Sequence, residues 1–311
     1  MKLFKIDEHK LKSIPSTNFS YEREMQNLTE NNMTILLGVD FLQSEFTVDK
    51  YRLDSVAFDS DTNSFVIVEY KNNTNSSVID QGYSYLNTML NHKADFVLLY
   101  NHVYDKNESK KFFDWSQTRI IFVAKGFTQY QRDAVDNPEL PIELYEVKKY
   151  KNNYLTLNQI EKSKIAQSSR IVDKDLKDTS KIDTAKEIKL YTENDQLVRG
   201  SQEVQDLYQK LKDTILSWDS NISLKATKLY LGFRLNKHNV TDIEIRKKQI
   251  KLWINLKKGE LNDPRQITRD VSHTGHWGNG DFEIVLKNDD DLEYILSLIK
   301  QSWKKAIQTE N

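Results

Sequence analysis

The chain has 311 residues, enough for two domains that each bury a core. It contains no cysteine, which excludes disulfides, thiolate metal sites and thiol catalysis. No apolar run approaches the ~18 residues needed to cross a bilayer, and the first residues lack the apolar segment of a secretory signal. We therefore expect a cytoplasmic protein that does not enter membranes.

The two halves of the chain differ in charge, although the net charge is only −1. Residues 1–150 contain 17 basic and 22 acidic side chains, a balance of −5, whereas residues 151–311 contain 28 and 24, a balance of +4. Residues 225–258 alone hold ten basic side chains against two acidic ones. This cluster is either a surface that faces phosphate groups or an ordinary solvated surface rich in lysine.

The hydrophobic pattern predicts a first domain over residues 1–157. It begins with a helix capped by Ser20, and the next strands are joined by short turns that favour antiparallel pairing. The expected helices are 21–37, 78–91 and 127–135, and the expected strands are 45–48, 52–58, 65–70, 96–100, 119–124 and 142–147. This order predicts an α/β fold with a mixed sheet flanked by helices.

A smaller domain is expected at the C-terminal end of the chain. Residues 158–199 are polar, with alternating lysine and aspartate, which predicts a partly helical connector. Residues 200–311 predict an α+β domain with helices at 202–218 and 289–307 and strands at 228–235, 242–245 and 249–256.

Two acids and a lysine lie on neighbouring strands of the first domain. Glu69 and Lys71 project to the same side of their strand, roughly 6 to 7 Å apart, because side chains alternate along a strand. Asp54 lies on the preceding strand and shares this face if the two strands form a hairpin. Two carboxylates can hold a hard divalent cation, and a nearby lysine can orient a water or stabilise a developing anion.

With the helices on either side, these residues resemble the PD-(D/E)XK nuclease superfamily, in the branch that includes RecB-like and NucS-like nuclease domains. The helix after the strands contains Gln81 and Tyr85 in the Q-x-x-x-Y spacing of that branch. The acid on the first helix corresponds to Glu22, with Glu24 as the alternative that periodicity cannot separate from it. Asp54 follows Leu53 where the family often has proline.

The resemblance implies a nuclease that hydrolyses phosphodiester bonds with Mg²⁺ or Mn²⁺, and DNA is the expected substrate. Asp54, Glu69 and Glu22 would bind metal, and Lys71 would activate or orient the attacking water. Gln81 would position Lys71 or the substrate, with Tyr85 packed beneath it. Arg52 is expected to contact a phosphate or to pair with Glu22 or Glu69. A homodimer is one assembly that the resemblance allows.

Other interpretations remain open. The chain is also similar to two-domain bacterial proteins with an uncharacterised C-terminal domain, some labelled predicted transport proteins, but the lack of a spanning segment disfavours transport. The alternative function is a non-catalytic module that binds nucleic acid or protein on a nuclease scaffold. Residues 273–280 are rich in glycine, and here His273, His276 and Asp281 form either a second ligand site or a tight structural loop.

Overall fold

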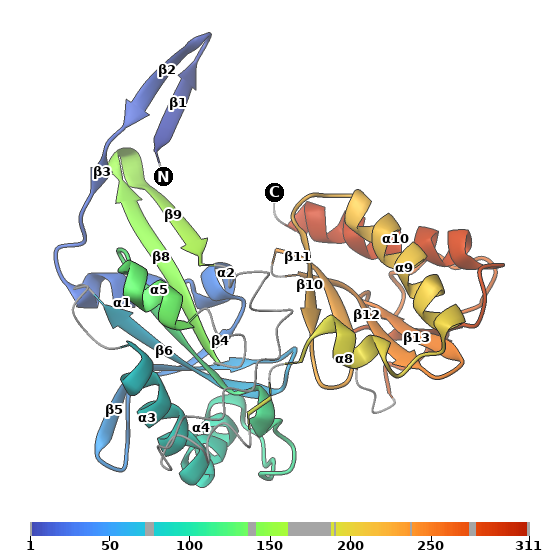
Figure 1. Cartoon of the computed structure of the whole chain (residues 1–311), viewed down its shortest axis with the longest axis horizontal. Coiled ribbons are helices and arrows are strands. Elements are labelled where there is room, and N and C mark those ends of the chain that lie inside the picture. The colour runs from blue at the N-terminus through green and yellow to red at the C-terminus, as the bar shows by residue number, and fades with distance from the viewer. Residues whose placement is uncertain are drawn as a thin grey trace. The chain divides into compact units, whose positions relative to one another are not determined.

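The computed structural model of the chain contains two compact units, Met1–Leu190 and Tyr191–Asn311, which are described separately (Figure 1). Most of the expected connector at 158–199 lies outside the described residues. The structure describes residues 2–71, 78–135, 141–160, 188–189, 191–236, 238–273 and 278–309. Within these residues, no helix is both long enough and apolar enough to cross a bilayer.

A seven-stranded mixed sheet forms the centre of the first unit, with the strand order β3-β8-β7-β6-β5-β4 and β9 paired to β8. Short turns join β4, β5 and β6 into an antiparallel meander, whereas β6, β7 and β8 run parallel and need crossover connections. The strands are β3 (Ser16–Thr17), β4 (Asp40–Val48), β5 (Tyr51–Asp59), β6 (Ser64–Lys71), β7 (Arg119–Ala124), β8 (Ile142–Tyr150) and β9 (Tyr154–Gln159).

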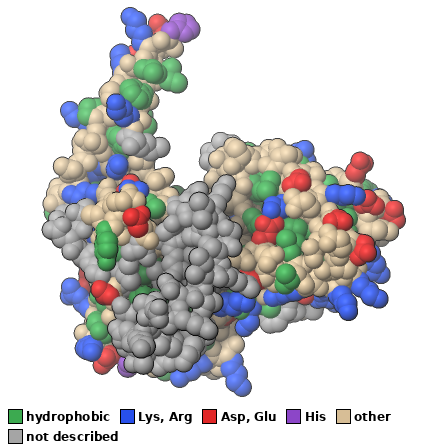
Figure 2. Space-filling model, viewed as in Figure 1, with side chains coloured by type: hydrophobic (Ala, Val, Ile, Leu, Met, Phe, Trp, Pro, Cys, Tyr) green, Lys and Arg blue, Asp and Glu red, His purple; other side chains and the backbone are tan. Residues whose placement is uncertain are grey.

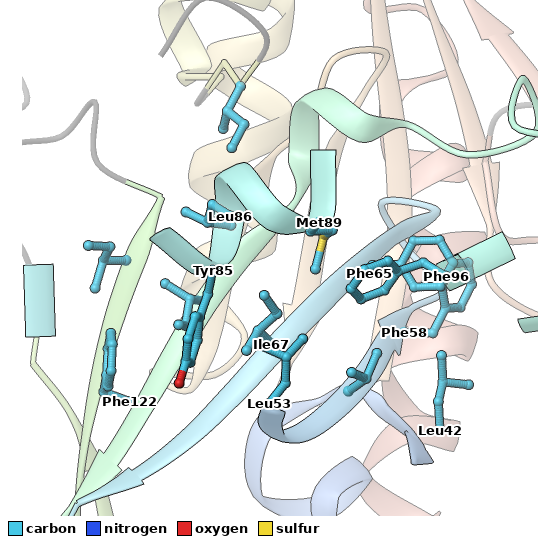
Figure 3. Packing of buried hydrophobic residues seen from close by; sticks show 14 of the residues in the cluster. Leu42, Leu53, Phe58, Phe65, Ile67, Tyr85, Leu86, Met89, Phe96 and Phe122 are labelled. Carbon is cyan, nitrogen blue, oxygen red and sulfur yellow. The ribbon is translucent and has the colours of Figure 1, made fainter. Parts of the chain in front are cut away.

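Helices cover both faces of this sheet because β6 is apolar on both sides. Val66 and Val68 pack with Met25 of α1 on one face. Phe65 and Ile67 pack on the other face with α3 and α4, and Figure 3 shows Leu86 and Met89 over Ile67. The helices are α1 (Glu22–Glu30), α2 (Met33–Leu37), α3 (Val78–Asn91), α4 (Lys93–Tyr104) and α5 (Gln129–Val135), with short 3₁₀ turns η1 (Trp115–Gln117) and η2 (Lys151–Asn153).

Three expectations for the first unit are wrong. The N-cap of α1 is Tyr21 and not Ser20, and no side chain caps this helix. The apolar run 96–100 is not a strand but part of α4, where Phe96 and Tyr100 are buried and Leu98 is 67% exposed. A short apolar run does not distinguish a strand from a buried helix by periodicity alone. The expected helix at 21–37 is two helices, because α1 ends before Asn31 and α2 runs only from Met33 to Leu37, where Gly38 caps it with a φ of 67°.

The chain begins with a hairpin that the sequence pattern did not predict. Strands β1 (Leu3–Asp7) and β2 (Lys10–Ile14) pair with each other in a separate two-stranded sheet. Phe4, Ile6 and Leu11 are 44%, 73% and 65% exposed on it. Figure 2 shows hydrophobic and basic side chains along the hairpin.

The second unit is a six-stranded antiparallel sheet with the order β10-β11-β12-β13-β15-β14. Apolar side chains of the long helices α9 and α10 share one core with the sheet. The strands are β10 (Ile222–Ala226), β11 (Leu231–Leu235), β12 (His238–Arg246), β13 (Gln249–Ile254), β14 (Arg269–Asp270) and β15 (Phe282–Leu286), and the helices are α8 (Glu193–Leu197), α9 (Gln202–Ser217) and α10 (Leu292–Thr309). The pattern predicted both long helices but missed β10, β14 and β15.

Candidate active site

The candidate site lies where β5 and β6 stop pairing through their backbones. Their ladder runs from Asp59 opposite Ser64 to Ser55 opposite Val68. Immediately beyond it, two side chains replace the backbone bonds. The backbone N of Tyr70 donates to Oδ2 of Asp54 at 3.0 Å, and the backbone N of Asp54 donates to Oε1 of Glu69 at 3.0 Å. The gap between the strands therefore holds the two carboxylates close together.

Helix α3 and the end of β6 add an amide, a phenol and an amine to this pair. Gln81 donates from Nε2 to Oε2 of Glu69 at 3.1 Å and to the hydroxyl of Tyr85 at 3.0 Å. Lys71 Nζ lies 3.6 Å from the same Oε2 of Glu69. The ring of Tyr85 packs edge-on against the ring of Tyr51, with 5.5 Å between the ring centroids. The structure thus brings together Asp54, Glu69, Lys71, Gln81 and Tyr85, and Gln81 contacts the acid rather than the lysine.

Burial makes this site electrostatically strained without a cation. Glu69 is 1% exposed, and burial followed by the charge of Asp54 raises its pKa to about 8. Burial also raises the pKa of Asp54. The hydrogen bond from Tyr70 and the charge of Lys71 lower this pKa, but burial has the larger effect. Like charges in a desolvated place disfavour ionisation, so Glu69 holds its proton to a higher pH than an exposed glutamate does. A divalent cation would relieve this conflict, and the carboxylate pair is chemically suited to hold one.

The two candidate acids of the first helix have different roles. Glu24 forms an ion pair with Lys149 and accepts a hydrogen bond from the backbone N of Ser20, and both contacts lower its pKa. Glu22 is the first residue of α1, and its charge contributes to the raised pKa of Asp54. Of the two acids, Glu22 is therefore the one whose charge acts on Asp54, whereas Glu24 is paired with Lys149. Among the described residues, however, no three His, Cys, Asp or Glu side chains are grouped closely enough to hold a metal.

Arg52 makes a different contact from the ion pairs expected for it. Its Nε lies 2.7 Å from Oε2 of Glu45, and its side chain is 69% exposed. Glu45 also pairs with Arg23 at 2.5 Å. The expected ion pair with Glu22 or Glu69 is therefore replaced by one between β5 and β4.

Sequence reasoning missed a polar network beneath the site. Gln26 is 4% exposed, and its Nε2 lies 3.0 Å from the carbonyl oxygen of Asp54 and 2.9 Å from Oε1 of Glu30. Ser55 donates to the same Oε1 at 2.7 Å, and its hydroxyl lies 3.2 Å from that of Tyr70. Gln26 follows Glu22 by four residues and so lies on the same face of the helix. This spacing is the feature of the sequence that could have indicated that Gln26 lies near the site. This network attaches α1 to the strands that carry the acids.

The proposed second site is only partly described. His273 is exposed, His276 lies outside the described residues, and Asp281 accepts a hydrogen bond from the backbone N of Lys258 at 2.9 Å. A β-carbon at Gly280 would lie 1.9 Å from the carbonyl oxygen of Ile254, so only glycine allows this approach. These contacts favour the structural interpretation of the loop.

The chain is similar along nearly its whole length to a protein of Haemophilus influenzae described as "Uncharacterized protein". The two are 44% identical over 304 residues, which cover 98% of this chain and 100% of the relative. This chain belongs to the same family. Within the family's shared length, residues 193–306 match the "Domain of unknown function (DUF5655)".

Three solved structures are similar to about half of this family member. The EndoMS complex with double-stranded DNA is 16% identical and covers 47% of this chain and 64% of its own, with a TM-score of 0.25. A repair endonuclease from Pyrococcus abyssi is 18% identical, and the match covers 47% of this chain and 65% of the endonuclease, with a TM-score of 0.25. SfsA of Pyrococcus furiosus in complex with Ca²⁺ is 12% identical, and the match covers 48% of this chain and 76% of SfsA, with a TM-score of 0.25.

Proposed function

We propose that the first unit is a metal-dependent nuclease of the PD-(D/E)XK type, in the RecB-like and NucS-like branch, and that it hydrolyses DNA. The observation that supports this most directly is the meeting of Asp54, Glu69 and Lys71 where β5 and β6 separate. Gln81 holds the same glutamate from α3. A surface charge cluster would not need a buried glutamate with a raised pKa.

Asp54 and Glu69 are the residues that would hold Mg²⁺ or Mn²⁺, with Glu22 close enough to add to the negative potential. When bound, such an ion lowers the pKa of water and offsets charge on a phosphate. Glu69 must release its proton for this, and Lys71 beside it favours the ionised form.

The chain's own groups orient the reaction. Gln81 fixes one oxygen of Glu69 and is itself held by Tyr85, so the carboxylate cannot rotate freely. Lys71 is 17% exposed, which leaves its amine within reach of solvent and of a phosphate. It can orient an attacking water or stabilise the negative charge that develops on the phosphate.

Cleavage of single- and double-stranded DNA with Mg²⁺ or Mn²⁺ tests the proposal. We expect Asp54→Ala and Lys71→Ala to reduce the cleavage rate at least ~100-fold, the usual scale for a lost catalytic group. The matched controls are Asp95→Ala and Lys106→Ala, which replace exposed residues of α4 and of the segment after it. Equal cleavage rates for the wild type, the two site variants and the two controls would refute the proposed nuclease activity.

The second candidate is a non-catalytic binding module on the same scaffold. It is favoured by the lack of a third acid grouped with Asp54 and Glu69 among the described residues. Calorimetric titration with Mn²⁺ separates the two candidates, since the nuclease requires binding that Asp54→Ala abolishes. Absence of Mn²⁺ binding at millimolar concentration would favour the module.

A further inference from the structure

One end of the sheet in the second unit collects basic residues. The strand pairing places the β10–β11 turn, the β12–β13 turn and the end of β15 at this same end. The segment before α9 joins them, because the backbone N of Ser201 donates to the carbonyl oxygen of Lys247 at 3.0 Å. In that segment the guanidinium of Arg199 donates to the carbonyl oxygen of Lys228, also at 3.0 Å. The basic row, as we call these residues, consists of Arg199, Lys228, Lys247, Lys248 and Lys287.

The protein does not neutralise the charges of the basic row. All five residues are exposed, and none of them forms an ion pair with another described residue. Neighbouring acids already have basic partners, in the pairs Glu244–Arg246, Asp289–Lys210 and Asp291–Arg265. Three further acids lie close to the row in sequence, but the five basic charges outnumber them: Asp195, Glu203 and Asp290. Like charges repel, so the row weakens the fold unless an anion binds it.

The basic row is long enough to match a stretch of polyanion. From the β10–β11 turn to the end of β15 it crosses three to four strand spacings of about 4.8 Å, or roughly 17 Å in all. Successive phosphates of one DNA strand are about 3.4 Å apart along the helix axis, so about five of them fall within this length. A small anion would contact only part of the row. This spread of charge along a line therefore favours a nucleic-acid backbone over a small anion.

We infer that the basic row binds the phosphate backbone of double-stranded DNA. The choice of DNA rests on the proposed function of the first unit, whose residues 1–150 carry a net charge of −5 and so do not by themselves attract a polyanion. The Haemophilus influenzae relative matches both units, so the unit with the basic row accompanies the candidate nuclease within the family. Contacts to the backbone carry no base information, and binding should therefore be independent of sequence.

Fluorescence anisotropy with a labelled duplex of mixed sequence tests the inference, with the full chain in EDTA to prevent metal-dependent cleavage. The test variant is Lys247→Gln with Lys248→Gln, which changes two exposed residues of a surface turn and should melt like the wild type. At about 0.1 M salt, loss of two phosphate contacts should weaken binding about tenfold or more. The slope of log affinity against log salt concentration should become shallower by about 2.

The matched control is Lys257→Gln with Lys304→Gln, which removes the same charge from exposed residues after β13, at the opposite end of the sheet, and in the last turns of α10. It should bind like the wild type, which separates a local contact from the loss of net charge.

Asp54→Ala should also bind the duplex in EDTA, because Asp54 lies outside the basic row. A chain that binds DNA through the row but cleaves none with Mg²⁺ would refute the proposed function and leave this inference standing. The inference is overturned if the duplex does not bind or if the test variant and the control bind with equal affinity and salt slope. It is also overturned if the test variant loses binding to phosphatidylglycerol vesicles but not to DNA.

Discussion

At the scale of single residues, the site is defined by two buried acids, and the charge of Asp54 opposes the ionisation of Glu69. Asp54 and Glu69 exchange hydrogen bonds with the backbones of β5 and β6, so neither can move away from the other. Burial raises the pKa of both. A cation that binds between the two carboxylates favours their ionised forms, so its binding would offset the cost of ionising Glu69.

Glu69→Gln tests this conflict. The pKa of Glu69 rises from 4.5 to about 8 on folding, so the folded state holds the proton more tightly. This stabilisation is complete below pH 4.5 and is lost as the pH rises towards 8. Glutamine mimics the protonated acid, so without metal the variant should be more stable than the wild type at high pH, by on the order of 1 to 3 kcal/mol.

Thermal unfolding across this pH range, with EDTA or with Mn²⁺, provides the measurement. The control is Glu293→Gln, which changes an exposed glutamate of α10. Mn²⁺ should stabilise the wild type and have little effect on Glu69→Gln. Parallel stability curves for the wild type and the variant in EDTA would show that Glu69 is not strained.

At the scale of elements, the attachment of α1 to the sheet decides how the site is built. The continuous apolar run along β6 correctly indicated a buried strand, and the three-strand meander followed from the short turns between strands. The nature of α4 did not follow from its sequence, because Phe96 to Tyr100 is apolar enough for either structure. The contact of Gln26 with Asp54 could not be derived from local pattern, since it joins residues 28 positions apart.

Gln26→Ala tests the role of this attachment. The substitution leaves the carbonyl of Asp54 and the carboxylate of Glu30 without the amide that contacts them. We expect the free energy of unfolding to fall by about 1 to 3 kcal/mol, the cost of leaving buried polar groups unpaired. DNA cleavage should also slow, because the strand bearing Asp54 is held less firmly.

Denaturant unfolding and the cleavage assay measure the two effects. Asn27→Ala is the control, because Asn27 is the next residue of α1 and is exposed. If Gln26→Ala unfolds at the same denaturant concentration as this control, the network has no structural role.

At the scale of the whole molecule, the chain consists of two units with separate cores. The family model for DUF5655 covers only the second unit, whereas the Haemophilus influenzae relative extends over both. The pairing of the two units is therefore shared within the family.

Core truncations in each unit test their independence. Leu86 of α3 and Leu252 of β13 are both fully buried, at 0% exposure. Each change to alanine should cost about 2 to 5 kcal/mol in its own unit. Calorimetric melting of the full chain should show two transitions, with Leu86→Ala lowering one and Leu252→Ala the other. A single transition that both variants shift equally would contradict independent units.

The sequence by itself determined the strands of the meander, the two long helices of the second unit and the set Asp54, Glu69, Lys71, Gln81 and Tyr85. The strands, the helices and the shared face of Asp54, Glu69 and Lys71 depend on alternation and spacing within short segments, whereas the resemblance to a known family singled out Gln81 and Tyr85. Tertiary structure alone paired Glu24 with Lys149 and Arg52 with Glu45, placed Gln26 beside the carbonyl of Asp54 and made 96–100 helical. Each of these depends on which distant segment lies alongside, and the pattern of a single segment does not contain that information.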